Sequence, residues 1–371
     1  MKFTCDKASL QNAINIASKA TSPKSPIPSL EGILIEAGEG KVGMTGYDLK
    51  KGIYTSVEAS VSEPGSVVIG ARIFGDIVRS LPNGNVTVKT SGKNNVTISC
   101  DNSEFSIIFT DSTDYPELPS VDGRSGVCLP QSLLGDMIRR TIFAISDNEA
   151  RPVYTGALFE IGTDDFAICA CDGYRLAIRR EKAENISDQS AFIVPGNALS
   201  DLEKLCSDNE DETVEIILGS KHIKFTIGNT VLISRRLEGE FINYKKAVPS
   251  QFNVSVTAER TVLQRSVERV SLIIDDKIKN PLRCTFGDHE IRVMCATALG
   301  KAEDICPVDG SGNDVVVGFN NRYLLDALKA APADNIKINI NTGSSPCVIT
   351  PEDESDQFLY MILPVRLKAG E

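Results

Sequence analysis

TGYDL, at residues 45–49, is the first copy of a segment that returns further along the chain. Its aspartate, Asp48, has a counterpart 124 residues later in Asp172 of CDGYRL (171–176). The same spacing relates four flanking positions: Leu10 to Leu134, Ile14 to Ile138, Gly32 to Gly156 and Val42 to Phe166. A constant spacing over this length indicates a chain built from repeated structural units.

The repeat continues beyond this segment. Asp76 returns as Asp201, 125 residues later, and VVIGARIFGDIV (67–78) resembles VVVGFNNRYLLDAL (315–328). A third, more diverged copy keeps Leu263, Val267, Gly287, Ile291 and Val293. Three units of about 124 residues account for the whole chain of 371. The domains predicted from this are residues 1–121, 122–250 and 251–371.

Each unit divides into two similar halves, each a short strand, an amphipathic helix and three strands with period-2 patterning. In the first half, Leu10, Ala13, Ile14 and Ala17 form one apolar stripe at helical spacing. The expected helices are 7–20, 72–81, 131–145, 197–207, 258–274 and 320–331. The fold class predicted is α+β, with helices on one side and antiparallel sheets on the other.

Composition places the chain among ordinary folded proteins, because 42% of its residues are hydrophobic and 24% are charged. No segment approaches the roughly 18–20 apolar residues of a membrane span. The opening MKFTCDKASL also lacks the apolar run of a secretory signal. We therefore expect a soluble, cytoplasmic protein.

The ten cysteines contain no C-x-x-C pair, and most lie in apolar runs, so we expect reduced, buried thiols. Cys169 and Cys171 share one face of a strand, but the sequence supplies no histidines beside them for a metal. We expect neither a metal nor a cofactor.

The net charge of −11 argues against a protein that is basic all over. The six expected helices nevertheless hold 12 basic and 7 acidic residues, which gives them +5 and leaves −16 for the rest of the chain. If the helices share one side, that side is basic. The chain has no tryptophan, no basic cluster and no zinc-finger spacing, so any contact with DNA is expected to be independent of sequence.

Several motifs together give the chain a resemblance to a known family. They are MKFT at the start, TGYDL, DSTDYPELP (111–119), CDGYRLAI (171–178), FINY (241–244) and LPVRL (363–367). With the threefold repeat, these resemble the bacterial DNA polymerase III beta subunit family, the replicative sliding clamps, over residues 1–367. Only Lys368–Glu371 lies beyond the match.

The resemblance implies a DNA-clamp fold and a head-to-tail homodimeric ring of six repeats, with helices inside and sheets outside. Such a ring encircles double-stranded DNA without sequence specificity and tethers the polymerase for processive synthesis. It catalyses no reaction, and the sequence has no G-x-x-x-x-G-K-[ST] loop for ATP. The implied partners are the alpha-type polymerase subunit, a clamp-loader ATPase, other DNA polymerases, and mismatch-repair and ligase proteins.

The same resemblance implies an apolar pocket that binds short hydrophobic peptides of these partners. Matched by motif, its residues are Tyr154, Cys171, Gly173, Tyr174, Arg175, Leu176, Ile242, Lys246, Ala247, Pro346, Met361, Leu363, Pro364, Val365, Arg366 and Leu367. From the residues alone, DGYRL also fits an ordinary turn and LPVRL an ordinary last strand. The chain reads FINY where many relatives have FPDY, and Cys171 replaces a hydroxyl-bearing residue, so the peptide preference is expected to differ.

Two further surfaces follow from the resemblance. The residues matched to DNA contact are Lys24, Asn148 and Arg151, although exposed residues of these types are often only solvated. The basic side of the helices adds the expected DNA-facing residues Arg72, Arg79, Arg139, Arg140, Arg265 and Arg269. The dimer contact is expected to pair Phe105 and Ile107 with Leu272 and Ile273 of a second copy. The alternation of Phe105 and Ile107 also fits a core-facing strand.

Parts of the sequence also fit two other classes of function, a hydrolase and a protein-binding scaffold. A hydrolase would use Cys171 beside Asp172 or a histidine, but His222 and His289 are both far from this motif in the sequence. A protein-binding scaffold built from repeats would have the same pocket without encircling DNA, and would be a monomer. Retention on circular against linear DNA separates a scaffold from a clamp.

Overall fold

The computed structural model describes residues 1–92, 94–182, 189–275, 280–353 and 358–367. By its internal contacts, the chain forms two compact units. The first unit combines Met1–Gly135 with Asp201–Arg236, and the second combines Asp136–Ser200 with Leu237–Glu371. Each unit therefore holds strands from two of the three repeats found in the sequence.

The first unit contains two antiparallel sheets. The five-stranded sheet runs in the order β5 (Ser60–Glu63), β1 (Lys2–Asp6), β7 (Asn85–Ser91), β8 (Asn95–Cys100) and β9 (Ser103–Ile108). The eight-stranded sheet runs in the order β10 (Arg124–Pro130), β15 (Thr213–Leu218), β16 (His222–Ile227), β17 (Thr230–Arg235), β4 (Lys51–Glu58), β3 (Lys41–Tyr47), β2 (Gly32–Gly38) and β6 (Gly65–Gly70). In the second sheet, β17 pairs with β4, so one hydrogen-bonded ladder joins strands of two repeats.

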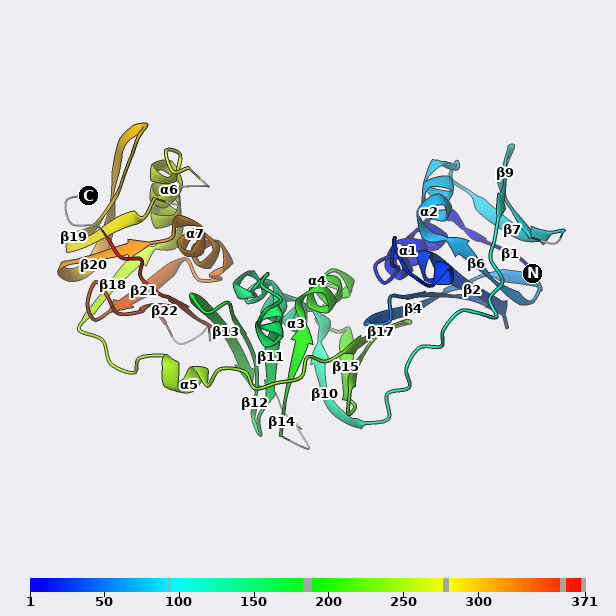
Figure 1. Cartoon of the computed structure of the whole chain (residues 1–371), viewed down its shortest axis with the longest axis horizontal. Coiled ribbons are helices and arrows are strands. Elements are labelled where there is room, and N and C mark those ends of the chain that lie inside the picture. The colour runs from blue at the N-terminus through cyan, green and yellow to red at the C-terminus, as the bar shows by residue number, and fades with distance from the viewer. Residues whose placement is uncertain (93, 183–188, 276–279, 354–357, 368–371) are drawn as a thin grey trace. The chain divides into compact units, whose positions relative to one another are not determined.

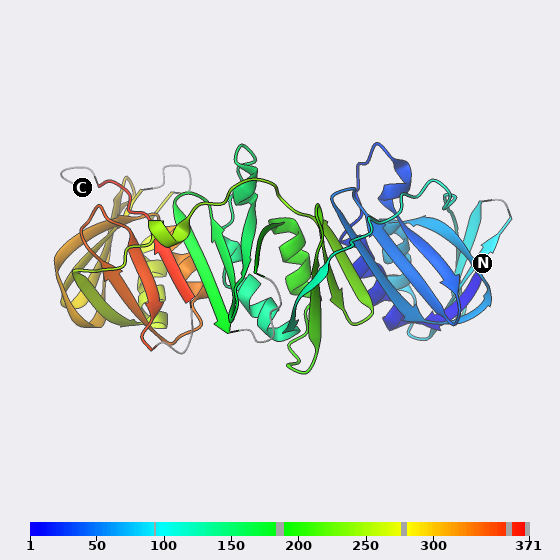
Figure 2. The same ribbon diagram turned by 90° about the horizontal axis from the view of Figure 1, so that it is seen from below.

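Helices α1 (Lys7–Ser18) and α2 (Ala71–Ser80) contact each other in this unit and cover its sheets (Figure 1). In Figure 2 the blue strands of this unit lie in front of these helices. Helix α1 begins at Asp6, whose Oδ2 accepts a hydrogen bond of 2.9 Å from the backbone N–H of Ser9. The predicted stripe of α1 is buried, and it joins apolar residues of both sheets in one core.

The second unit is built on one ten-stranded antiparallel sheet. Its order is β14 (Ser190–Pro195), β11 (Gly156–Ile161), β12 (Asp165–Cys171), β13 (Arg175–Lys182), β23 (Phe358–Ile362), β22 (Cys347–Pro351), β21 (Asn335–Ile340), β18 (Val254–Glu259), β20 (Gly300–Phe319) and β19 (Leu282–Thr297). The pairing of β13 with β23 again joins two repeats, at Arg175 opposite Ile362. Helices α6 (Arg260–Ser271) and α7 (Asn321–Ala330) pack together over this sheet.

Short helices complete the described chain. Helices α3 (Gln131–Arg139) and α4 (Gly196–Leu205) each contain a boundary between the two units. The remaining helical turns are η1 (Pro28–Glu31), η2 (Ile142–Ala144), η3 (Pro152–Thr155) and α5 (Tyr244–Ala247). No helix in the described part of the chain is long and apolar enough to cross a membrane.

All six predicted helices are present, but five are shorter than expected, and the largest differences are at α3 and α6. The sequence pattern predicted a helix over 131–145, but α3 ends at Arg139. The buried hydroxyl of Thr141 donates to the carbonyl oxygens of Met137 and Ile138, which competes with continuation of the helix. The chain then forms the separate turn η2.

All ten cysteines are free thiols, as predicted, but the expectation that they are buried is wrong for Cys128 and only partly met by Cys206. Cys128 is exposed, because it alternates with buried Val127 and Leu129 along β10, the edge strand of its sheet. Cys206 is half-buried, and the other eight cysteines are buried.

Candidate functional site

An apolar cluster in the second unit brings together several of the residues predicted for the peptide pocket. Its buried members are Leu158, Cys169, Cys171, Leu176, Ile178, Ile193, Tyr244, Val348 and Met361. Half-buried residues, including Phe241 and Ala247, pack against them. Cys171, Leu176, Met361 and Ala247 were all predicted, although they come from three separate parts of the sequence.

The turn between β12 and β13 forms one edge of this cluster. Asp172 Oδ1 accepts hydrogen bonds from the backbone N–H groups of Tyr174 (2.8 Å) and Arg175 (3.0 Å). Gly173 has a φ of 92°, which a side chain would disfavour. The turn leaves the side chain of Tyr174 63% exposed, so an aromatic ring is presented to solvent beside buried Cys171.

The segment after β23 lies along this turn. The backbone N–H of Leu363 donates to the carbonyl of Tyr174 (2.8 Å), and that of Val365 donates to the carbonyl of Gly318 (2.8 Å). Val365 and Arg366 are exposed, while Leu363, Pro364 and Leu367 are half-buried. The predicted LPVRL segment is therefore held by backbone hydrogen bonds, with its side chains partly open to solvent.

The linker around α5 forms another part of the rim. Ile242 is 37% exposed, and Ala247 packs on the cluster. The ring of Phe241 meets that of Tyr154 edge to face, with 5.5 Å between the ring centroids. Of the other residues predicted here, Lys246 is exposed and Pro346 is half-buried.

Tyr244 anchors this linker. Its hydroxyl donates to Oε2 of Glu160 on β11, and it accepts from the Arg180 guanidinium on β13 (3.3 Å). Lys245 Nζ is 3.3 Å from Oε1 of the same glutamate. Burial and then the hydrogen bond to Glu160 raise the pKa of Tyr244 well above its ordinary value, so the hydroxyl remains a donor even at about pH 10, where an ordinary tyrosine is half ionised.

Arg175 is held inside the protein rather than pointing freely at a ligand. Its side chain is 11% exposed and pairs with Asp172 (3.0 Å) and with Asp326 of α7 (2.5 Å). Its guanidinium carbon lies 4.4 Å from the centre of the Tyr323 ring and 5.4 Å from that of Phe143. The sequence predicted Arg175 in the pocket but gave no indication of these partners.

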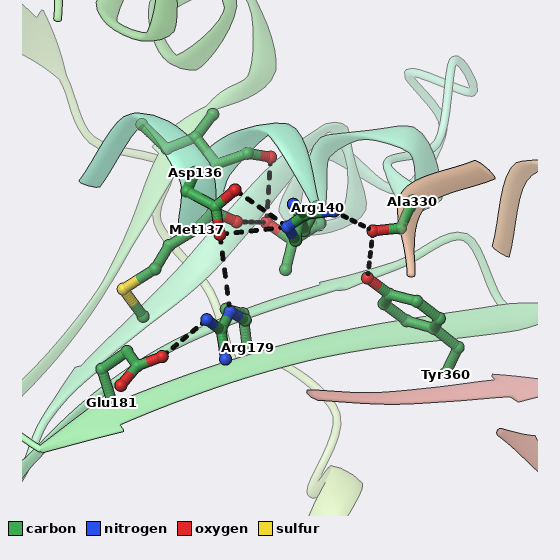
Figure 3. A network of polar contacts seen from close by, with 9 residues as sticks. Asp136, Met137, Arg140, Arg179, Glu181, Ala330 and Tyr360 are labelled. Atoms are coloured by element: carbon green, nitrogen blue, oxygen red, sulfur yellow. Dashed lines mark hydrogen bonds and ion pairs between the residues drawn. The ribbon is translucent and has the colours of Figure 1, made fainter. Parts of the chain in front are cut away.

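Arg140, predicted to face DNA, is also engaged within the chain (Figure 3). It pairs with Asp136 (2.8 Å) and donates to the carbonyl oxygen of Ala330 at the end of α7 (2.7 Å). The hydroxyl of Tyr360 donates to the same carbonyl (3.2 Å). Arg140 thus satisfies a carbonyl at a helix end that has no partner within the helix.

The other residues predicted to face DNA are at the surface. Arg72 and Arg79 flank Asp76 on α2, with side chains 97% and 65% exposed. Arg269 is 57% exposed and pairs with Asp304. The remaining five are exposed: Lys24, Arg139, Asn148, Arg151 and Arg265. Of all the residues predicted to face DNA, Lys24, Arg72 and Arg79 belong to the first unit, and the other six, including Arg140, belong to the second.

The predicted dimer residues also lie at exposed edges. Strand β9 is an edge strand of the five-stranded sheet, and there Phe105 is 37% exposed. Ile107 packs against the core, as its alternation also allowed, while the neighbouring Ile108 is 76% exposed. In the second unit, Leu272 is 84% exposed after α6, and Ile273 is half-buried.

Comparison with known proteins gives the family. Models of the N-terminal, central and C-terminal domains of the DNA polymerase III beta subunit match residues 1–119, 128–243 and 245–366. The chain belongs to the DNA polymerase III beta subunit family. A curated "Beta sliding clamp" of Staphylococcus aureus is 31% identical over 376 residues, covering 99% of each chain.

Solved structures of beta subunits support the same family assignment. A putative DNA polymerase III beta subunit of Eubacterium rectale is 31% identical, with a TM-score of 0.93 over 98% of this chain and 99% of that one. The DNA polymerase sliding clamp of Bacillus subtilis is 28% identical, with a TM-score of 0.94 over 99% of this chain and 100% of that one. The predicted sliding-clamp fold with three similar domains is therefore confirmed.

Membership of the beta subunit family also confirms the predicted class of function. The chain is a non-catalytic sliding clamp that works with DNA and a DNA polymerase to make synthesis processive. A hydrolase based on Cys171 has no support, because that thiol is 4% exposed and burial raises its pKa. No group of three His, Cys, Asp or Glu side chains suited to a metal ion occurs within the described ranges.

Several residues of this beta subunit's site were missed in the sequence. Tyr244 lies in the quoted FINY motif, but its partner Glu160 is 84 residues away and has no recognisable motif. Asp326 was noticed only as part of the repeat. Its position, equivalent to that of Asp201, was the one available signal that it has a shared structural role.

Proposed function

We propose that this beta subunit works as a head-to-tail homodimeric ring around double-stranded DNA. Each chain would contribute three clamp domains, at residues 1–121, 122–250 and 251–371. Two exposed edges support a closed contact between copies: β9 with Phe105 and Ile108 on the first unit, and the segment around Leu272 on the second. When copies join through two different patches, they form a closed ring only if the rotation from one copy to the next is suitable.

The native mass tests the dimer. Light scattering behind a sizing column at low micromolar concentration is expected to give a mass near twice the chain mass of 40.1 kDa. A ring should also stay on nicked circular DNA at high salt and slide off the same DNA once it is cut to a linear form. A mass near 40.1 kDa at every concentration would overturn the ring.

DNA contact within the ring is proposed to be electrostatic and independent of sequence. Its candidate residues are Lys24, Arg72, Arg79, Arg139, Arg140, Asn148, Arg151, Arg265 and Arg269. Arg72 is the clearest of them, since its side chain is 97% exposed. Binding of open rings to short DNA should weaken steeply as salt increases, because each phosphate contact releases counterions.

The apolar cluster with its rim is the proposed docking site for partner peptides. The observation that carries this proposal is the exposure of Tyr174 (63%), Val365 (40%) and Ile242 (37%) around a buried apolar floor. We propose that short peptides with leucine and phenylalanine anchors bind there. Their sources would be the alpha-type polymerase subunit, the clamp-loader ATPase, other polymerases, and mismatch-repair and ligase proteins, all in the cytoplasm.

Fluorescence anisotropy with a labelled hexapeptide that ends in Leu-Phe tests the docking site. We expect saturable binding that Met361→Asp abolishes, because a carboxylate would be placed in the apolar floor. Val42→Asp makes the same kind of change in the core of the first unit and serves as a control for general loss of fold. Equal peptide affinity in folded Met361→Asp and wild type would show that the peptide does not bind at this site.

A further inference from the structure

Two turns of the chain, one in each unit, have the same hydrogen-bonded geometry. Asp48 Oδ1 accepts from the backbone N–H groups of Lys50 (2.8 Å) and Lys51 (2.6 Å). Asp172 Oδ1 accepts in the same way from Tyr174 and Arg175, 124 residues later. The residue after each aspartate is left-handed, with φ of 70° at Leu49 and 92° at Gly173. The second turn forms an edge of the proposed docking site, whereas the first does not.

Each of these turns is followed by a cation that pairs with an aspartate on a helix of the next repeat. Lys51 Nζ pairs with Asp201 of α4, and both side chains are largely buried, at 6% and 15% exposed. Arg175 pairs with Asp326 of α7 at 2.5 Å. The two aspartates are themselves 125 residues apart: Asp201 is the counterpart of Asp76, and Asp326 lies in the segment 315–328 that resembles residues 67–78. The ion pairs therefore recur at equivalent places.

The third repeat shows that the turn does not itself require the cation. There the backbone N–H of Leu299 donates to Thr297 Oγ1 (3.1 Å), so Thr297 takes the place of Asp48 and Asp172. Ala296 pairs with Lys301 across this hairpin, as Tyr47 pairs with Gly52 in the first repeat. Gly300 consequently occupies the position of the cation. The cations at 51 and 175 thus serve the contact with the following helix.

The Arg175 pair is linked to the docking site in a way that the Lys51 pair is not. The carbonyl of Tyr174, the residue before Arg175, accepts the N–H of Leu363 at 2.8 Å. The ring of Tyr174 also stacks on that of Tyr323 in α7, with centroids 6.4 Å apart. The contact with α7 therefore fixes the turn against which the LPVRL segment is aligned.

We propose that Asp326 is a positioning residue for peptide binding. Through Arg175 it holds the turn 172–174 against α7, and thereby sets the spacing between Tyr174 and residues 363–367. Asp326 is outside the apolar cluster. It lines a polar groove of about 480 Å³ that also includes Tyr174 and Arg175, so this groove adjoins the rim of the docking site. Asp326 would therefore act through Arg175 and not as part of the apolar floor. The inference rests on the proposed docking function of the cluster.

Matched variants at the two equivalent aspartates test this role. Asp326→Asn removes the charge that holds Arg175 and should weaken binding of the labelled Leu-Phe hexapeptide about fivefold, the effect of a partly buried ion pair. Asp201→Asn makes the same chemical change at the other pair and should leave the affinity at the wild-type value. Asp326→Glu keeps the charge and should recover most of the lost affinity, which a purely steric role would not allow.

A second variant loosens Arg175 by another route. Tyr323→Leu removes the ring that the Arg175 guanidinium packs against, while keeping an apolar side chain on α7. Like Asp326→Asn, it should lower the affinity for the peptide. Far-ultraviolet circular dichroism and native mass of each variant report whether the fold and assembly are retained. Wild-type affinity in folded Asp326→Asn, or an equal loss in Asp201→Asn, would overturn the positioning role. Absence of peptide binding by the wild type would instead overturn the docking function.

Discussion

Tyr244 donates a hydrogen bond from its hydroxyl to Glu160, 84 residues earlier in the chain. The bond ties the linker that carries Ile242 and Ala247 to strand β11. Tyr244 is 4% exposed, and its ring belongs to the floor of the docking site. The rim of that site is thus positioned by one phenol and one carboxylate.

Replacement of Tyr244 by phenylalanine should weaken peptide binding about fivefold, since the linker loses one hydrogen bond to a charged acceptor. Anisotropy with the labelled Leu-Phe hexapeptide measures the change. Tyr115→Phe is the matched control: its buried hydroxyl donates to the carbonyl of Thr45 (3.0 Å) in the first unit. If Tyr244→Phe and Tyr115→Phe bind the peptide equally well, the hydroxyl of Tyr244 does not position the docking site.

The same hydroxyl gives a pH dependence of stability. Because the pKa of Tyr244 is raised in the folded protein above its ordinary 10.0, its stabilising contribution is complete below pH 10 and is lost as the pH rises toward the folded value. The difference in urea midpoint between wild type and Tyr244→Phe should therefore stay constant up to about pH 10 and shrink above that pH. A difference that grows with pH would contradict this sign.

Alkylation should distinguish the cysteines by exposure and by pKa. Exposed Cys128 should react with iodoacetamide first, and Cys171 much later, because only the thiolate reacts and burial raises the pKa of Cys171 above 9.0. The rate at Cys171 should still be rising past pH 9. Peptide mapping by mass spectrometry gives both rates, and bound Leu-Phe hexapeptide should slow only the reaction at Cys171.

A chain that ends at Ile362 should lose peptide binding and keep its dimer. Leu363–Leu367 supplies the side chains beside Tyr174 and two backbone hydrogen bonds, while the proposed dimer edges lie at β9 and Leu272. Anisotropy and light scattering on the same sample measure the two properties. Unchanged affinity of the shortened chain would show that the LPVRL segment takes no part in docking.

Leu272→Asp should convert the proposed dimer to a monomer, because a carboxylate would replace a leucine side chain that the proposed contact buries between copies. In one chain that leucine is 84% exposed, so the folded chain itself should lose little stability. Leu49→Asp changes another exposed leucine, on the turn of the first unit, and should leave the mass near twice 40.1 kDa. Equal masses for the two variants would argue against this edge.

Local pattern was enough to predict the helices and the repeat. The stripe from Leu10 to Ala17 identified α1, and the spacing of Asp48 and Asp172 identified two turns that the structure forms alike. The sequence could not reveal that Lys51 pairs with Asp201, 150 residues away, or that Arg175 pairs with Asp326, 151 residues away. Such pairs arise from the packing of one repeat on the next, and periodicity contains no information about partners that distant.

The ladders that cross repeat boundaries limit how the protein can be divided. Strand β4 relies on β17 for its outer hydrogen bonds, and β13 relies on β23. A fragment cut at either boundary would expose a long, apolar strand edge, which invites pairing with other copies. Isolated repeats of this chain should consequently be poorly soluble and prone to aggregation. Proteolytic nicks in the linkers should leave the pieces bound together rather than release them as separate domains.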